Sequence, residues 1–208
     1  MNMHIIWDLD GTLIDSSDVI LEEVISVCNH FNININEKQL KTTLESQSIS
    51  RYIKDLEKNC GLAENEIKSI FSANLIKRNK DLKLNNYAYE ILVYLSELGI
   101  KCYVCTNKGK NTYEVLKELN IIHFFEDIIT SNEVEQKKPS PEGILIILER
   151  YKIDPQSVYY IGDKPSDAEA ANSAKVKSIN LSVTTSDVNT RIDELIDIKK
   201  IIDKELGN

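Results

Sequence analysis

The segment WDLDGTLIDS, Trp7 to Ser16, places two aspartates two residues apart, directly after an apolar run. The run from His4 to Asp8 predicts a short buried strand, and Asp10-Gly11 is a pair that turns also use. Alternate residues of an extended segment point the same way, so Asp8 and Asp10 can serve one ligand. For an isolated motif of this kind a turn is the commoner interpretation, and the rest of the sequence has to distinguish the two.

Composition limits the classes of function. The chain has 208 residues, of which 42% are hydrophobic, so it can bury a proper core. Its formal net charge of -8 gives no basic surface for a phosphate backbone, and nucleic acid is excluded as a main partner. Because no apolar run approaches the roughly 20 residues of a membrane helix, we expect no membrane association and a cytoplasmic location.

The four cysteines lack the spacing of a disulfide framework. Cys102 and Cys105 form a C-x-x-C pattern, but they fall in a predicted strand, where residues three apart point to opposite faces. A shared metal or redox pair is therefore not expected. The three histidines are scattered, and no two have the spacing of metal ligands.

Short apolar runs alternate with longer amphipathic stretches along most of the chain, which is typical of a parallel sheet flanked by helices. The predicted fold class is therefore α/β, with a Rossmann-like, doubly wound parallel sheet. The predicted strands are residues 4–8, 101–106, 127–130, 158–162 and 177–181.

One segment does not follow this alternation. Residues 16–84 have helical patterns throughout and no strand pattern, which predicts an α-helical cap domain inserted into a core domain of residues 1–15 and 85–208. Asp15 and Ser16 are expected to cap the first helix of the insertion. The tail, residues 190–206, is expected to form a final amphipathic helix packed on the sheet.

Polar side chains gather where the predicted strands end, which is where ligands bind in an open parallel sheet. Clustered carboxylates repel one another, so they share protons or bind a cation. Oxygen ligands with room for water suit Mg2+, and Mg2+ favours a phosphate group as substrate. The strand-end segments are residues 8–12, 106–108 and 162–167, with Lys137-Lys138-Pro139 before the fourth strand.

At these positions the chain resembles the haloacid dehalogenase (HAD) superfamily of phosphohydrolases. DLDGT, Thr106-Asn107, Lys138-Pro139 and GDKPSD are similar to its four motifs, and they occur in the expected order between Asp8 and Asp167. The superfamily places its lysine directly before proline, which favours Lys138 over Lys137. The helical insertion resembles the cap of phosphoglycolate phosphatase-like members.

The resemblance implies roles for the two aspartates of the first motif. Asp8 would attack phosphorus and form an aspartyl-phosphate, which divides one hard displacement into two easier ones. Asp10 would protonate the leaving alkoxide and then activate the hydrolytic water.

The resemblance also implies the binding residues. Mg2+ would be held by Asp8, by the backbone carbonyl of Asp10 and by Asp163, with Asp167 in its outer shell. Lys138 would also neutralise charge near Asp8. The residues implied to bind the phosphoryl oxygens are Thr106, Asn107 and Lys138.

The expected reaction is hydrolysis of a small phosphomonoester, and other reactions of the superfamily fit less well. A dehalogenase needs no acid at position 10. A phosphonate hydrolase needs a Schiff-base lysine, and neither Lys41 nor Lys54 stands out. A phosphosugar mutase stays the nearest alternative, although it usually has a histidine soon after the first motif and residues 16–28 contain none. A non-catalytic module that binds a phosphorylated metabolite also stays open.

Specificity is expected to come from the cap. The break at residues 45–51 separates two predicted helices, and Arg51, aided by Gln47 or Ser48, is the candidate contact with the leaving group. An exposed helix arginine is an equal alternative. The physiological substrate and the oligomeric state do not follow from the sequence.

Overall fold

The computed structural model describes residues 3–207, so residues 1, 2 and 208 of the predicted core domain lie outside the described part. The chain divides into two compact units, one of residues 1–15 with 83–208 and one of residues 16–82. The second boundary lies two residues before the expected one. Lys83–Leu84 forms a short strand, β3, that pairs antiparallel with β2 (Ile14–Asp15), so these residues belong with the core unit.

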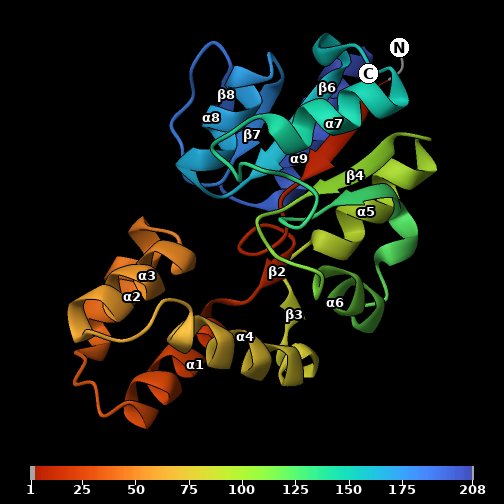
Figure 1. Ribbon diagram of the computed structural model, residues 1–208. Helices are drawn as coiled ribbons and strands as arrows, with labels where there is room; N and C mark the ends of the chain where they lie inside the picture. Colours follow the sequence, from red (N-terminus) through yellow and green to blue (C-terminus); the bar gives the residue numbers. More distant parts are fainter. Residues whose placement is uncertain (1–2, 208) are drawn as a thin grey trace. The chain divides into compact units, whose positions relative to one another are not determined.

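Within the described residues, the core unit contains a six-stranded parallel sheet in the order β5-β4-β1-β6-β7-β8 (Figure 1). The chain moves outward from β1 in one direction to β4 and β5, and in the other through β6 to β7 and β8. The predicted doubly wound α/β fold is therefore confirmed. The strands are β1 (His4–Trp7), β4 (Lys101–Cys105), β5 (Phe125–Ile129), β6 (Val158–Gly162), β7 (Lys177–Asn180) and β8 (Asn189–Arg191).

Helices cover both faces of this sheet. On one face, buried side chains of α7 and α8 form a hydrophobic cluster with Tyr103, Cys105 and Tyr160. On the other face, the Tyr159 hydroxyl donates to Glu205 of α9, and Tyr94 of α5 donates to Asp203 of α9. The helices of the core unit are α5 (Ala88–Glu97), α6 (Thr112–Glu118), α7 (Glu142–Tyr151), α8 (Pro165–Ser173) and α9 (Ile198–Leu206), with short 3-10 turns at residues 122–124, 155–157 and 195–197.

The expectation of a single helix over residues 190–206 is wrong at its start. Thr190 lies in β8, where it pairs with Ile179 of β7, and the helix α9 begins only at Ile198. The Asn189 side-chain amide donates to the carbonyls of Val183 and Thr184. These bonds fold the preceding loop back on the strand and hold the segment extended.

The second unit, residues 16–82, is helical. It consists of α1 (Ser17–His30), α2 (Glu37–Ser46), α3 (Ile49–Cys60) and α4 (Glu66–Lys77), followed by a 3-10 turn at residues 79–81. Apolar side chains from all four helices pack into a core of its own. Ser16 precedes the first turn of α1, but its side chain makes no capping bond among the described residues, so that part of the capping prediction is wrong. No helix in the described part of the chain is long and apolar enough to cross a membrane.

Candidate active site

The site forms where three neighbouring strands end. β1 is paired on both sides, by β4 and by β6, so the residues after these strands meet at the same edge of the sheet. Asp8 directly follows β1, and its backbone N–H donates to Ile161 of β6 at 2.8 Å. Thr106 follows β4, and Asp163 follows β6. The fold thus gathers side chains that are far apart in the sequence.

Lys138 lies at the centre of this group. Its Nζ is 2.8 Å from Asp8 Oδ1 and 2.6 Å from Asp167 Oδ1, and it donates to the Tyr160 hydroxyl at 2.6 Å. The lysine side chain is only 4% exposed. Burial acts to lower the pKa of Lys138, but the carboxylates of Asp167 and Asp8 outweigh it and raise the pKa. The ammonium therefore stays charged beside Asp8.

Two side chains fix Lys138 from outside the ion pairs. The Asn107 amide donates to the Lys138 carbonyl at 3.2 Å and accepts from the Lys138 backbone N–H at 3.0 Å. The Tyr160 hydroxyl donates to the Cys105 carbonyl at 2.8 Å, so its lone pairs face the ammonium. The Lys138-Pro139 peptide is cis. Asn107, which the resemblance implies as a phosphate ligand, thus binds the lysine-bearing loop with its side chain.

Three carboxylates form a group that could hold a metal ion. Asp8, Asp163 and Asp167 each offer an oxygen, and these oxygens lie within 4.8 Å of one another. Burial raises the pKa of Asp8, and it raises the pKa of Asp163, where the neighbouring charges of Asp8 and Asp167 add to the effect. A divalent cation would offset this repulsion, and a set of carboxylate oxygens is what Mg2+ prefers. The residues therefore fit the predicted cofactor.

Asp167 makes further contacts that the sequence did not indicate. Its Oδ2 accepts the backbone N–H groups of Asp163 and Lys164, at 3.2 and 2.9 Å, at the start of α8. Its Oδ1 pairs with Lys138. Asp167 is 1% exposed, so its carboxylate is surrounded by these donors. The Asp167 carboxylate therefore links the loop after β6 to the Lys138 ammonium.

The Asp10 side chain has a different partner. Both carboxylate oxygens lie near Lys108 Nζ, at 3.2 and 3.1 Å. The Thr106 hydroxyl accepts the Lys108 backbone N–H at 3.2 Å. Sequence reasoning assigned no role to Lys108, although it directly follows the Thr106-Asn107 pair.

The turn after β1 brings the backbone close to Asp163. Gly11 has a φ of +90°, and a Cβ there would lie 2.3 Å from Asp163 Oδ2. The Thr12 hydroxyl donates to Asp163 Oδ1 at 3.2 Å. The Asn85 amide donates to the Gly11 and Thr12 carbonyls, which fixes the turn. The DG pair is thus a turn and part of the acidic site at once.

Arg51 belongs to the helical unit. It lies in the first turn of α3, with its side chain 76% exposed and its Nε 3.9 Å from Asp55. Its backbone N–H is within 3.4 Å of the Ser48 hydroxyl, which caps the helix. The contact of Arg51 with a substrate stays a prediction.

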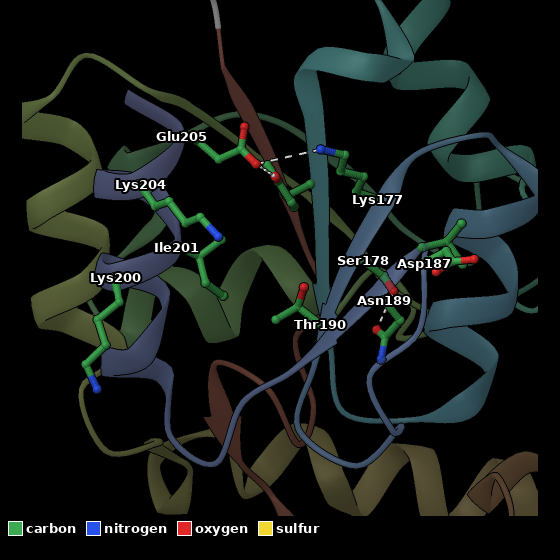
Figure 2. A pocket seen from close by; sticks show the side chains of 11 residues that line it. Lys177, Ser178, Asp187, Asn189, Thr190, Lys200, Ile201, Lys204 and Glu205 are labelled. Carbon is green, nitrogen blue, oxygen red and sulfur yellow. Dashed lines mark hydrogen bonds and ion pairs between the residues drawn. The ribbon is translucent and has the colours of Figure 1, made fainter. Parts of the chain in front are cut away.

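A cavity of about 400 Å³ lies away from the acidic group, beside β7, β8 and α9 (Figure 2). Charged side chains line the cavity, but several of them already form ion pairs with other residues of this chain. Lys177 pairs with Glu205 at 3.7 Å, and Lys200 pairs with Asp197 at 3.1 Å. Ser178 donates to Asn189 at 2.5 Å. These pairings give the cavity no evident preference for a charged ligand.

A doubly wound parallel sheet with clustered carboxylates and a buried lysine at its strand ends is an arrangement suited to a hydrolytic enzyme. Residues 5–181 match the family of haloacid dehalogenase-like hydrolases, and the chain belongs to that family. The predicted superfamily and the prediction of a hydrolase are thereby confirmed.

The relatives of this chain include enzymes that are named for different activities. The chain is 29% identical over 220 residues to a phosphoglycolate phosphatase of Nitrosococcus oceani, with 95% of each chain covered. It is 27% identical over 195 residues to the pyrophosphatase PpaX of Anoxybacillus flavithermus, covering 88% of this chain and 86% of that one. A crystal structure described as a predicted phosphoglycolate phosphatase from Haemophilus somnus has the same fold, with a TM-score of 0.80, 23% identity, and 97% and 99% of the chains covered.

Proposed function

We propose that this chain is a Mg2+-dependent phosphatase that hydrolyses a small phosphomonoester through an aspartyl-phosphate on Asp8. The observation that carries the proposal is the placement of Asp8, which is buried, 2.8 Å from the Lys138 ammonium and within the carboxylate group that includes Asp163. A nucleophile beside a fixed cation is suited to attack on an anionic phosphoryl group, because the cation offsets the charge repulsion.

In the first step, an Asp8 oxygen forms a bond to phosphorus while the bond to the leaving oxygen breaks. Asp10 gives its proton to that leaving oxygen. In the second step, water attacks phosphorus, Asp10 takes a proton from the water, and the bond between Asp8 and phosphorus breaks to release inorganic phosphate. Asp10 ends protonated and Asp8 ends as a carboxylate, so the cycle is balanced.

The remaining residues bind and orient. Lys138 and Thr106 are proposed to contact the phosphoryl oxygens. Asn107 is proposed to act indirectly, by holding the backbone of Lys138 through two hydrogen bonds. Asp8, the Asp10 carbonyl and Asp163 would hold Mg2+, with Asp167 nearby. When bound, the ion would supply positive charge that offsets the repulsion between these carboxylates and a phosphate.

The names of the relatives support release of a phosphoryl group from a small molecule, because one is a phosphoglycolate phosphatase, which acts on an ester, and another is a pyrophosphatase, which acts on an anhydride. Residues 16–82 are proposed to act as a cap domain, with Arg51 contacting the leaving group. A cytoplasmic location is also proposed. A phosphosugar mutase stays the second candidate, because it would use the same two aspartates.

The test is turnover of p-nitrophenyl phosphate by the full chain, with Mg2+ and with excess EDTA. We expect Mg2+-dependent release of phosphate, and we expect Asp8→Asn to lower kcat by at least about a thousandfold, because the nucleophile is lost. Turnover that persists in Asp8→Asn would contradict the mechanism. A mutase would instead need a bisphosphorylated sugar to sustain turnover and would convert one sugar phosphate isomer into another.

A further inference from the structure

The two aspartates of the first motif are paired with different lysines. Asp8 is paired with Lys138, whereas the Asp10 carboxylate has Lys108 Nζ within 3.2 Å of both of its oxygens. The side chains of this second pair are largely enclosed, at 12% exposure for Lys108 and 24% for Asp10. An ammonium that contacts both oxygens restricts rotation of the carboxylate more than a single contact would.

The backbone of Lys108 is held from two directions. Its N–H donates to the Thr106 hydroxyl at 3.2 Å, and its carbonyl accepts the Ser131 N–H at 2.9 Å. Thr106 follows β4, and Ser131 follows β5, so the lysine stands on a loop fixed at the ends of two paired strands. The Lys108 side chain thus extends to Asp10 from a backbone that is hydrogen-bonded on both sides.

The position of Asp10 itself is less constrained by its own segment. It follows β1 by three residues and lies in the turn that begins there. Its backbone is held by the turn, but its side chain projects from it and needs a partner to take one orientation. Lys108 is that partner in the part of the chain that the structure describes.

We propose that Lys108 is a positioning residue that holds the Asp10 carboxyl group in the orientation for proton transfer to the leaving oxygen. The role rests on the proposed phosphatase function and deepens it. Its consequence is selective, because only a leaving group that needs a proton benefits from an oriented acid. An alkoxide is a strong base and needs that proton, whereas p-nitrophenolate departs without it.

The alternative role for Lys108 is direct binding of an anionic substrate. A binding cation would act on ground state and transition state alike, so its loss would raise KM for every phosphate ester and leave kcat nearly unchanged. A positioning role instead lowers kcat/KM for alkyl phosphates and spares the aryl ester. The two roles are therefore separated by their dependence on the leaving group.

The experiment compares kcat/KM for glycerol phosphate and p-nitrophenyl phosphate with Mg2+ present. The ratio kcat/KM is used because it reports the steps up to formation of the aspartyl-phosphate, in which the leaving group departs. The proteins are the full chain, Lys108→Met, Lys108→Arg and the matched control Lys110→Met. Lys110 lies in the same loop and is exposed.

We expect Lys108→Met to lower kcat/KM for glycerol phosphate by roughly tenfold to a hundredfold, part of what a general acid supplies. The value for p-nitrophenyl phosphate should change less than about threefold, Lys108→Arg should restore part of the loss, and Lys110→Met should match wild type. In an Asp10→Asn background, Lys108→Met should add no further loss that depends on the leaving group.

Equal loss on both esters, or a rise in KM alone, would overturn the positioning role while wild-type turnover still supports the proposed function. Absence of Mg2+-dependent turnover in the wild type with every ester would contradict the proposed function and, with it, this role. Circular dichroism of each variant identifies misfolding. A folded Lys108→Met that acts on both esters like wild type would also overturn the proposal.

Discussion

Gly11 is the residue on which the geometry of the acidic group depends most directly. Its φ of +90° lies in the region that favours glycine, and the Asp163 carboxylate occupies the space where a Cβ would be. The turn therefore serves two purposes: it redirects the chain after β1 and allows Asp163 to approach Asp8. A side chain at this position would separate carboxylates that the proposed Mg2+ site needs close together.

We predict that Gly11→Ala weakens Mg2+ binding. The added methyl group would lie 2.3 Å from Asp163 Oδ2 and would have to push this carboxylate away. Disturbing a group that positions a metal ligand typically lowers metal affinity by about tenfold to a hundredfold. The measurement is the Mg2+ concentration that gives half-maximal turnover of p-nitrophenyl phosphate. An unchanged Mg2+ dependence would contradict the proposed part of Asp163.

Gly99→Ala is the matched control for this prediction. Gly99 also has a positive φ, +68°, but a Cβ there would meet nothing within 4 Å. This variant should lose about 1 kcal/mol of stability through backbone strain and keep the Mg2+ dependence of the wild type. The comparison separates the strain of a left-handed alanine from the collision with Asp163.

Residue identity allowed some of the site to be predicted, and tertiary contacts decided the rest. The acids after β1 and β6 and the lysine before Pro139 are recognisable because each follows a local pattern. The link between Lys108 and Asp10 spans 98 positions, and no local pattern encodes it. The same holds for Tyr160, whose sequence position indicates only a strand residue, whereas in the structure its hydroxyl accepts a hydrogen bond from Lys138.

At the scale of elements, the start of the C-terminal helix α9 was predicted too early, at residue 190 in place of Ile198. Periodicity over residues 190–206 fits a helix, but Thr190 and Arg191 extend beside β7 because the sheet offers backbone partners there. Strands at residues 83–84 and 189–191 are too short for a period-2 pattern to emerge. The longer strands and the helices between them carried enough residues to be predicted.

The packing of α9 gives a stability prediction. Ile202 is fully buried, whereas Ile201, the preceding residue on the helix, is partly exposed and lines the cavity in Figure 2. Ile202→Ala should lower the free energy of unfolding by about 3 kcal/mol through lost burial and the cavity it leaves. At about 3 °C for each kcal/mol, Tm should fall by roughly 9 °C.

Ile201→Ala removes the same atoms from the same helix and should lower Tm by no more than a third of that amount. Thermal unfolding followed by circular dichroism measures both variants. Equal losses in the two would mean that α9 does not pack on the sheet through the Ile202 face. Both variants should keep the Mg2+ dependence of wild type, since α9 contributes no residue to the acidic group.

At the scale of the whole molecule, the helical unit is inserted at a short antiparallel ladder. Asp15 and Lys83 are directly opposed in the pairing of β2 with β3, and Ile14 is opposed to Leu84. The two ends of the insertion therefore leave the core side by side. Each unit also buries its own hydrophobic cluster, so the core does not depend on residues 16–82 for its interior.

This arrangement predicts that the helical unit can be removed without unfolding the core. A chain in which Asn-Gly replaces residues 16–82 joins Asp15 to Lys83 through a two-residue turn, which suits directly opposed antiparallel residues. We expect this chain to keep a cooperative thermal transition and Mg2+-dependent turnover of p-nitrophenyl phosphate, because the acidic group, Lys138 and Lys108 all lie in the core unit.

We expect the shortened chain to discriminate less between different phosphomonoesters. If residues 16–82 set specificity as proposed, the ratio of kcat/KM between the best and the median ester of a phosphomonoester panel should fall by roughly tenfold or more, since contacts to the leaving group would be gone. Arg51→Ala in the full chain should reproduce part of that fall if Arg51 makes such a contact. Pyrophosphate, an anhydride, is measured beside the esters because a relative is named as a pyrophosphatase. A shortened chain with the selectivity of wild type would place specificity in the core unit.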